Sequence, residues 1–130
     1  MKILIADDSA LILERLQAIL AEIDEVEIVA SLDNGIDALA AMKNLNPDLA
    51  IIDIRMPGLT GLQVLDTIRK ENKSVIFILL TLQSQGYIKQ MAIQSGTNYF
   101  FNKADDFDQI IQVVSALSQK QNKNIKNHKQ

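Results

Sequence analysis

Short apolar runs of branched and aromatic residues recur along this chain, and they constrain its fold more than any other feature. Four of the runs end at a charged or hydroxyl side chain, namely residues 3–6 before Asp7 and Asp8, 49–52 before Asp53, 76–80 before Thr81, and 99–102 before Lys103. Such runs are too continuously hydrophobic for strands with one face in water, and are typical of parallel strands buried on both faces. The sequence therefore predicts a sheet that helices cover on both sides.

Stretches with helical spacing of leucine and isoleucine separate the apolar runs. We expect strands at residues 2–6, 26–31, 48–52, 74–80 and 98–102, and helices at residues 9–22, from 33 or 34 to 46, from 61 onward, at 86–95 and at 105–118. Ser9 is a candidate N-cap of the first helix, and Pro47 stops the second. Strict alternation of five strands and five helices predicts an α/β domain with a doubly wound parallel sheet.

Length and composition limit the class of protein. At 130 residues with 48% hydrophobic side chains, the chain can form one domain, which we place at residues 1–118. It has no cysteine, no signal peptide, and no apolar stretch near the roughly 20 residues that span a bilayer, so we expect a cytoplasmic protein. From Gln109 onward there are four lysines and no acidic residue. Residues 119–130 are predicted to be a flexible, polar, basic tail with only a weak nucleic-acid signal.

The polar residues at the strand ends predict a site. Ligands of open α/β sheets bind beyond the carboxyl ends of the strands. If the first and third strands are neighbours, Asp7, Asp8 and Asp53 lie together. Oxygen ligands alone select a hard cation, Mg²⁺ or Mn²⁺, and without it the clustered carboxylates should raise at least one pKa. With Thr81 and Lys103 nearby, the site is suited to a metal ion and a phosphoryl group.

These residues also carry a family resemblance. The chain resembles the receiver domain of two-component response regulators, of the chemotaxis-regulator type, over about residues 2–118. The matching residues are Asp7-Asp8-Ser9 after the first run, Asp53 with Met56-Pro57-Gly58 and Gly61, Thr81, and Gly96 with Lys103. The resemblance implies a flavodoxin-like sheet with the strand order 2-1-3-4-5.

The same resemblance implies roles for the acidic residues. Asp53 is then the phosphoacceptor, which takes a phosphoryl group from a phosphohistidine of a partner kinase. Asp8 and Asp53 are expected to bind Mg²⁺ directly and Asp7 through water, and the backbone carbonyl of Arg55 is expected to complete the protein ligands.

It also implies a switch. Lys103 is expected to pair with one phosphoryl oxygen and Thr81 to hydrogen-bond another. The inward movement of Thr81 then makes room for Phe100, which swings from exposed to buried and alters the surface of the fourth helix, fifth strand and fifth helix. The alternative for Phe100 is a core aromatic residue on a buried strand.

Two positions depart from the family pattern. The residue after Thr81 is usually small but is Leu82 here, whose side chain is expected to crowd the approach to the site and to make phosphorylation slow or partner-selective. The residue after Lys103 is usually proline, often after a cis peptide, but is Ala104 here. A cis bond would then cost about 2.5–4 kcal/mol, so we expect a trans bond or a rearranged loop. Arg55 and Gln83 border the site at variable positions.

The sequence thus predicts a signalling switch, not a turnover enzyme. We expect a stand-alone receiver that is phosphorylated by a histidine kinase or phosphotransfer protein and acts on a downstream protein, with no direct nucleic-acid contact, no membrane insertion, and possible homodimerisation on phosphorylation. Three alternatives stay open: a receiver fragment of a longer DNA-binding regulator, a receiver-like interaction module that takes no phosphate, and a small phosphatase. Against the phosphatase, the second position after Asp53 is Arg55 and not a carboxylate.

Overall fold

The computed structural model describes residues 1–82 and 86–128, with side chains described as far as residue 121. Strands and helices alternate along this part of the chain. The order is β1 (Lys2–Ala6), α1 (Ala10–Ala21), β2 (Glu27–Leu32), α2 (Gly35–Leu45), β3 (Leu49–Asp53), α3 (Gly61–Arg69), β4 (Ile76–Thr81), α4 (Gly86–Gln94), β5 (Tyr99–Asn102) and α5 (Phe107–His128).

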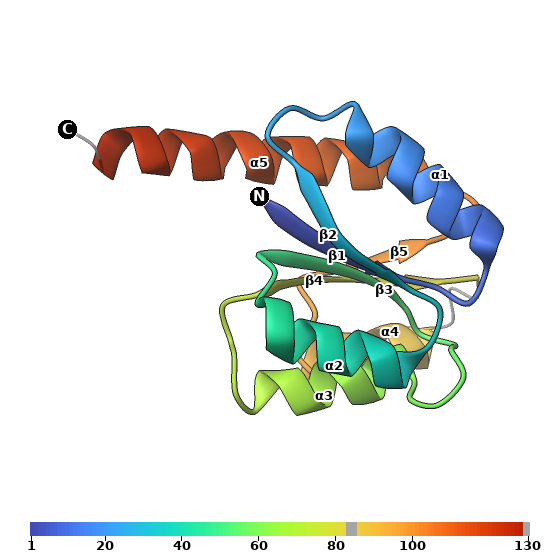
Figure 1. Cartoon of the computed structure of the whole chain (residues 1–130). Helices are drawn as coiled ribbons and strands as arrows, with labels where there is room; N and C mark the ends of the chain where they lie inside the picture. Colours follow the sequence, from blue (N-terminus) through green and yellow to red (C-terminus); the bar gives the residue numbers. More distant parts are fainter. Residues whose placement is uncertain (83–85, 129–130) are drawn as a thin grey trace.

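The strands form one sheet in which every pair of neighbours is parallel. Their order is β2-β1-β3-β4-β5, which confirms the predicted doubly wound fold and strand order. Helices α1 and α5 cover one face of the sheet, and α2, α3 and α4 cover the other (Figure 1). Because all strands run the same way, their carboxyl ends lie along one edge of the sheet.

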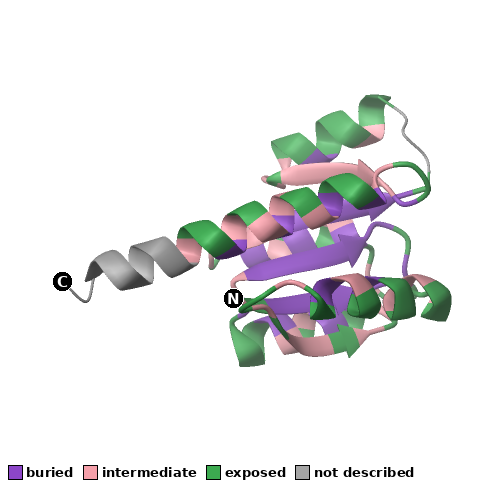
Figure 2. Ribbon diagram, turned by 90° about the horizontal axis from the view of Figure 1, so that it is seen from above, coloured by how far each residue is buried: buried purple, intermediate pink, exposed green. Residues whose placement is uncertain are grey.

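Two apolar cores form, one on each face of the sheet. Leu4, Ile52 and Phe77 belong to the core under α2–α4, and Ile5, Ile51 and Ile78 belong to the core under α1 and α5. Every residue of β3 is buried, as Figure 2 shows for the central strands. Burial on both faces explains why the central strands are continuous apolar runs.

Side-chain caps fix the starts of the helices that follow β1 and β2. The hydroxyl of Ser9 accepts a hydrogen bond from the backbone N–H of Ile12 at 3.3 Å, as predicted. Asn34, rather than Asp33, caps α2, since its side-chain oxygen accepts from the N–H of Asp37 at 2.8 Å. These caps satisfy N–H groups that a helix leaves without partners in its first turn.

The last helix differs from the prediction. We predicted that it ends at Ser118, but α5 continues to His128, so the expected boundary between domain and tail falls inside a helix. Flexibility of residues 119–130 stays a prediction. The other element bounds lie within two residues of those expected, and β3 and β4 include Asp53 and Thr81 as their last residues. In the described part of the chain, no helix has the length and hydropathy to cross a bilayer.

Candidate functional site

The pairing of β1 with β3 brings two aspartates together at the carboxyl edge of the sheet. Ala6 lies opposite Ile52, so the next residue on each strand, Asp7 and Asp53, are neighbours. Both side chains are buried, with 0% and 3% of their surfaces exposed, whereas Asp8 is exposed. Backbone donors hold them, because Ser9 N–H donates to Asp7 Oδ1 at 2.9 Å and Arg55 N–H donates to Asp53 Oδ1 at 3.4 Å.

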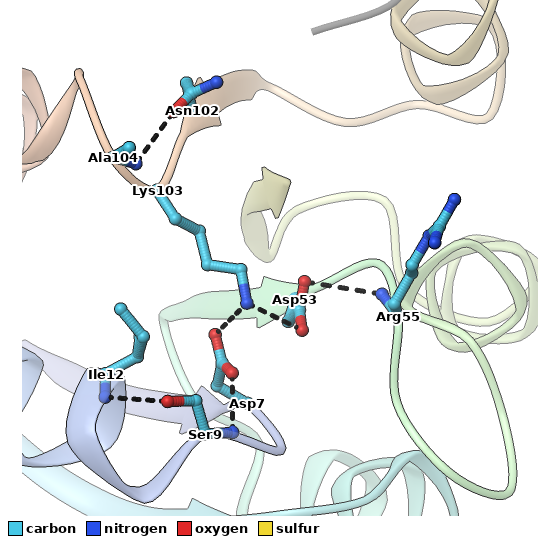
Figure 3. A network of polar contacts seen from close by, with 8 residues as sticks. All are labelled: Asp7, Ser9, Ile12, Asp53, Arg55, Asn102, Lys103 and Ala104. Atoms are coloured by element: carbon cyan, nitrogen blue, oxygen red, sulfur yellow. Dashed lines mark hydrogen bonds and ion pairs between the residues drawn. The ribbon is translucent and has the colours of Figure 1, made fainter. Parts of the chain in front are cut away.

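Lys103 joins the two buried carboxylates. Its Nζ lies 2.9 Å from Asp7 Oδ2 and 2.9 Å from Asp53 Oδ2, and the lysine itself is 5% exposed. Figure 3 shows the ammonium group between the two carboxylates, reached from the loop after β5. Three elements distant in the sequence therefore meet at one buried ion-pair network.

Burial and charge shift the pKa values of this network. Burial raises the pKa of Asp53 to about 6, with a further rise from the charge of Asp7, although the hydrogen bond from Lys103 opposes both. Burial also raises the pKa of Asp7. Burial alone would lower the pKa of Lys103, but its hydrogen bonds and charge interactions with Asp7 and Asp53 outweigh that effect and raise it. The expected rise in a carboxylate pKa is thus confirmed, and its largest cause is burial rather than repulsion.

The three carboxylates are spaced for a shared cation. One oxygen from each of Asp7, Asp8 and Asp53 lies within 4.8 Å of the other two. Hard oxygen donors are what Mg²⁺ and Mn²⁺ prefer, so the chemistry of the donor set fits either ion. The exposed carboxylate of Asp8 leaves the cluster open to solvent on one side.

A hollow of about 240 Å³ lies beside the network, lined by Asp8, Asp53, Arg55, Thr81, Leu82 and Lys103. Its walls thus combine carboxylates and a cation with the hydroxyl of Thr81, which ends β4 and is 5% exposed. Leu82 is 68% exposed at the same hollow. The hollow has room for a small tetrahedral anion beside Asp53, Thr81 and Lys103.

The other residues predicted for the switch or the border of the site are Phe100, Arg55 and Gln83. Phe100 is half-buried and packs against the core under α2–α4, opposite Leu79 in the β4–β5 register, so this structure places it between the exposed and buried positions. The side chain of Arg55 extends away from Asp53 in Figure 3. Metal ligation by its carbonyl stays a prediction. Gln83 lies outside the described residues.

The loop after Lys103 shows how the backbone accommodates Ala104 at a position where the family usually has proline. No peptide bond in the described residues is cis, which confirms the predicted trans bond before Ala104. Sequence reasoning missed two residues here, Asn102 and Asp106, whose side chains accept hydrogen bonds from the backbone of this loop. The signal was an asparagine at the start of a loop, since Asn side chains commonly accept from the backbone two residues on.

Comparison with known proteins agrees with this geometry. The family model of the response regulator receiver domain matches residues 3–115. The DNA-binding transcriptional activator EvgA of Escherichia coli is 33% identical over 116 residues, which cover 89% of this chain and 56% of EvgA. The chain spans a little over half the length of the curated relatives it matches.

Two solved structures have the same fold at higher coverage. The receiver domain of the Francisella response regulator 1452 has a TM-score of 0.82 at 27% identity, over 92% of this chain and 98% of that one. The DNA-binding response regulator of the LuxR family from Staphylococcus aureus has a TM-score of 0.78 at 26% identity, over 90% of this chain and 98% of that one.

Proposed function

The chain belongs to the response regulator receiver family, and we propose that it is a phosphoacceptor switch of a two-component phosphorelay. The observation that supports this most directly is the buried Lys103 ammonium group, at 2.9 Å from both Asp7 and Asp53 beside an open hollow. A purely structural ion pair needs one carboxylate. A second carboxylate on the same lysine, with a third close by, leaves excess negative charge that a bound cation would offset.

The proposed reaction is phosphoryl transfer to Asp53. A carboxylate oxygen of Asp53 attacks the phosphorus of a phosphohistidine on a partner kinase or phosphotransfer protein, and the phosphorus–nitrogen bond breaks. The electron pair of that bond stays on the imidazole, and an acyl phosphate forms on Asp53. Such transfers depend on positioning and on neutralising the phosphoryl oxygens, which the Lys103 ammonium group can do from its place beside Asp53.

We assign the acidic cluster to Mg²⁺, or to Mn²⁺ in its place. Asp7, Asp8 and Asp53 would hold the ion, with the backbone carbonyl of Arg55 as a further ligand. When bound, the cation supplies positive charge that offsets the phosphoryl group beside three carboxylates. Asp8 contributes the exposed side of the cluster, where the ion can enter from solvent.

Phosphorylation is proposed to act as a switch, without turnover of a separate substrate. Thr81 would hydrogen-bond the new phosphoryl oxygen, and Phe100, half-buried here, would move inward. The surface of α4, β5 and α5 would then change for a downstream protein partner, or for a second copy of the chain. We place this signalling in the cytoplasm.

Intact-mass measurement tests the proposal. The chain is incubated with Mg²⁺ and acetyl phosphate, and we expect a gain of one phosphoryl group that is labile to alkali and absent in Asp53→Asn. No gain, even with the cognate kinase, would favour a receiver-like interaction module, for which Leu82 at the mouth of the hollow is the supporting feature. Turnover of an unrelated phosphate ester would favour an enzyme.

One observation favours a second candidate, in which this receiver is part of a longer DNA-binding regulator. EvgA is a DNA-binding transcriptional activator, and the chain matches only 56% of its length. The mass of the natural protein, isolated from its source with an antibody to the receiver, separates the two candidates. A mass well above 14.5 kDa would favour the longer regulator, and a mass near this value would favour the stand-alone receiver.

A further inference from the structure

The position of Lys103 depends on a loop that lacks the proline usual in this family. Lys103 lies directly after β5, and its backbone N–H continues the sheet by donating to the carbonyl of Thr81 at 2.8 Å. From that point the chain must turn within a few residues to begin α5 at Phe107. Ala104 and Asp105 are exposed, so burial contributes little to holding the turn. Some other group must therefore fix the backbone on either side of Lys103.

The side chain of Asn102 restrains the part of the turn that follows Lys103. Its Oδ1 accepts a hydrogen bond from the N–H of Ala104 at 2.7 Å and another from the N–H of Asp105 at 3.2 Å. Figure 3 shows the first of these bonds directly across Lys103. One oxygen thus restrains the two residues that follow the lysine, in the way an Asn side chain stabilises a turn.

The side chain of Asp106 restrains the residue that precedes Lys103. Its Oδ2 accepts from the backbone N–H of Asn102 at 2.7 Å, while its own N–H donates to the carbonyl of Asn102 at 3.0 Å. Asp106 is in turn braced from α5, because Gln109 Nε2 donates to its Oδ1 at 3.2 Å. The first turn of α5 is therefore tied to the last residue of β5.

We infer that Asn102 and Asp106 form a reciprocal clasp around Lys103 and are positioning residues for phosphoryl transfer to Asp53. The inference rests on the proposed function. The clasp connects the strand and the helix on either side of the lysine, so that the side chain reaches 2.9 Å from both carboxylates with a trans peptide and no proline. Neither clasp residue contacts the reacting atoms, and both act through Lys103.

Lysine labelling tests the clasp without phosphorylation. The variants are Asn102→Ala, Asn102→Asp, which keeps an acceptor oxygen, and Asn44→Ala, an exposed asparagine of α2, as the control. Rates of acetylation by acetic anhydride are measured for each lysine by peptide mass spectrometry. We expect Asn102→Ala to raise the rate at Lys103 about tenfold, as for the loss of one or two hydrogen bonds. The rate at Lys43, whose side chain is 45% exposed, should stay unchanged.

Asn102→Asp should restore slow labelling of Lys103, and Asn44→Ala should leave it unchanged. An unaltered rate at Lys103 in Asn102→Ala would overturn the clasp. An equal rise at every lysine would also overturn it, because that result reports general loosening of the fold. Asp106→Asn also keeps an acceptor oxygen. Its rate of acetylation at Lys103 should lie between the rates of the Asn102→Ala variant and the unmodified chain.

The phosphorylation rate tests the role in transfer. With Mg²⁺ and acetyl phosphate, Asn102→Ala should be slower by roughly ten- to hundredfold, the effect of misplacing a catalytic group by about 1 Å. In a Lys103→Met background the same substitution should add nothing, because the clasp acts only through the lysine. If the unmodified chain is phosphorylated and Asn102→Ala matches it, the clasp has no role in transfer and the proposed function stands. If the unmodified chain takes no phosphoryl group, the proposed function and this role fail together, and labelling alone decides whether the clasp exists.

Discussion

At the scale of single residues, the site contains more negative than positive charge. One ammonium group, that of Lys103, serves two buried carboxylates, and a third carboxylate lies within 4.8 Å of both. Burying charges without enough partners lowers stability, and here the cost appears as a raised pKa at Asp53 and Asp7. The protein thus gives up stability at the point where it is proposed to bind a cation and a phosphoryl group.

The raised pKa of Asp53 predicts that metal-free protein loses stability as the pH rises. The folded-state pKa is about 6 and the ordinary value is 3.8, so the folded state holds the extra proton between these values. The unfolding free energy should fall by about 2 kcal/mol from pH 4 to pH 7 through this residue. In Asp53→Asn the part of the fall that Asp53 causes should be absent, and only the part that follows from the raised pKa of Asp7 should remain. Urea unfolding in the presence of a chelator measures it.

Asp66→Asn, an exposed carboxylate of α3, serves as the control and should keep the pH dependence of the unmodified chain. If Asp53→Asn and the unmodified chain lose stability in parallel across this range, Asp53 is not the group that holds the proton.

Replacing Lys103 should lower the unfolding free energy far more than replacing an exposed lysine. Lys103→Met leaves Asp7 and Asp53 buried without a counter-ion, which should lower the unfolding free energy by about 3–5 kcal/mol at pH 7. At pH 4 the loss should be smaller, because the carboxylates take up protons. Lys43→Met is the matched control, since Lys43 pairs with Glu71 at 3.8 Å in solvent and should contribute about 1 kcal/mol or less. Equal losses in the two variants would contradict the network.

At the scale of elements, hydrophobic pattern predicted where strands and helices lie, and contacts with the core explain its success. The central strands β1, β3 and β4 were expected because most of their residues are buried and therefore apolar, and the edge strands β2 and β5 were expected although they are only partly buried. The end of α5 was predicted wrongly at Ser118 because the apolar pattern stops at Leu117, and residues 119–128 include one apolar residue, Ile125. Beyond Leu117 the sequence has no repeated apolar spacing, so the length of the helix there depends on local helix propensity, which a hydrophobic pattern does not resolve.

The start of α3 gives an element-scale prediction. The N–H of Gly61 donates to the carbonyl of Ile54 at 2.8 Å, and a Cβ at Gly61 would collide with the backbone carbonyl of Asp53. Gly61→Ala should therefore push α3 away from the phosphoacceptor. We expect it to lower the unfolding free energy by about 1–3 kcal/mol and to slow phosphorylation. Chemical unfolding and intact-mass kinetics measure the two effects.

Gly86 provides the comparison, because a Cβ there meets nothing within 4 Å at the first residue of α4. Gly86→Ala should keep or raise stability by up to about 1 kcal/mol, since alanine favours helix. If the two substitutions have the same effect, close packing against Asp53 is not what requires a glycine at position 61.

At the scale of the whole molecule, parallel topology explains why the site was foreseeable. Strands that run the same way end at one edge, so Asp7, Asp53 and Thr81 had to lie near one another once the strand order was known. Asn102 at the start of a loop carried a weak signal, whereas the double ion pair of Lys103 and the hydrogen bonds of Asp106 were not foreseeable. They depend on side-chain rotamers and on a short loop, which residue pattern does not determine.

Binding of Mg²⁺ should stabilise the whole domain. At a free concentration about 10 times its Kd, the ion should raise the unfolding free energy by about 1.4 kcal/mol at pH 7. Near pH 5 the effect should shrink, because the ion competes with the proton that Asp53 holds below pH of about 6. Thermal unfolding with and without Mg²⁺ checks this. Asp66→Asn should respond as the unmodified chain does, and a full response in Asp53→Asn would exclude Asp53 as a ligand.

The central claim, that Asp53 receives a phosphoryl group, is tested most directly by locating the acyl phosphate. The chain is phosphorylated with acetyl phosphate and Mg²⁺, reduced with borohydride, digested, and mapped by tandem mass spectrometry. Borohydride converts an aspartyl phosphate to homoserine, so the account predicts homoserine at position 53. Unreduced aspartate at position 53, with homoserine at Asp7, at Asp8 or at no position in the chain, would contradict it.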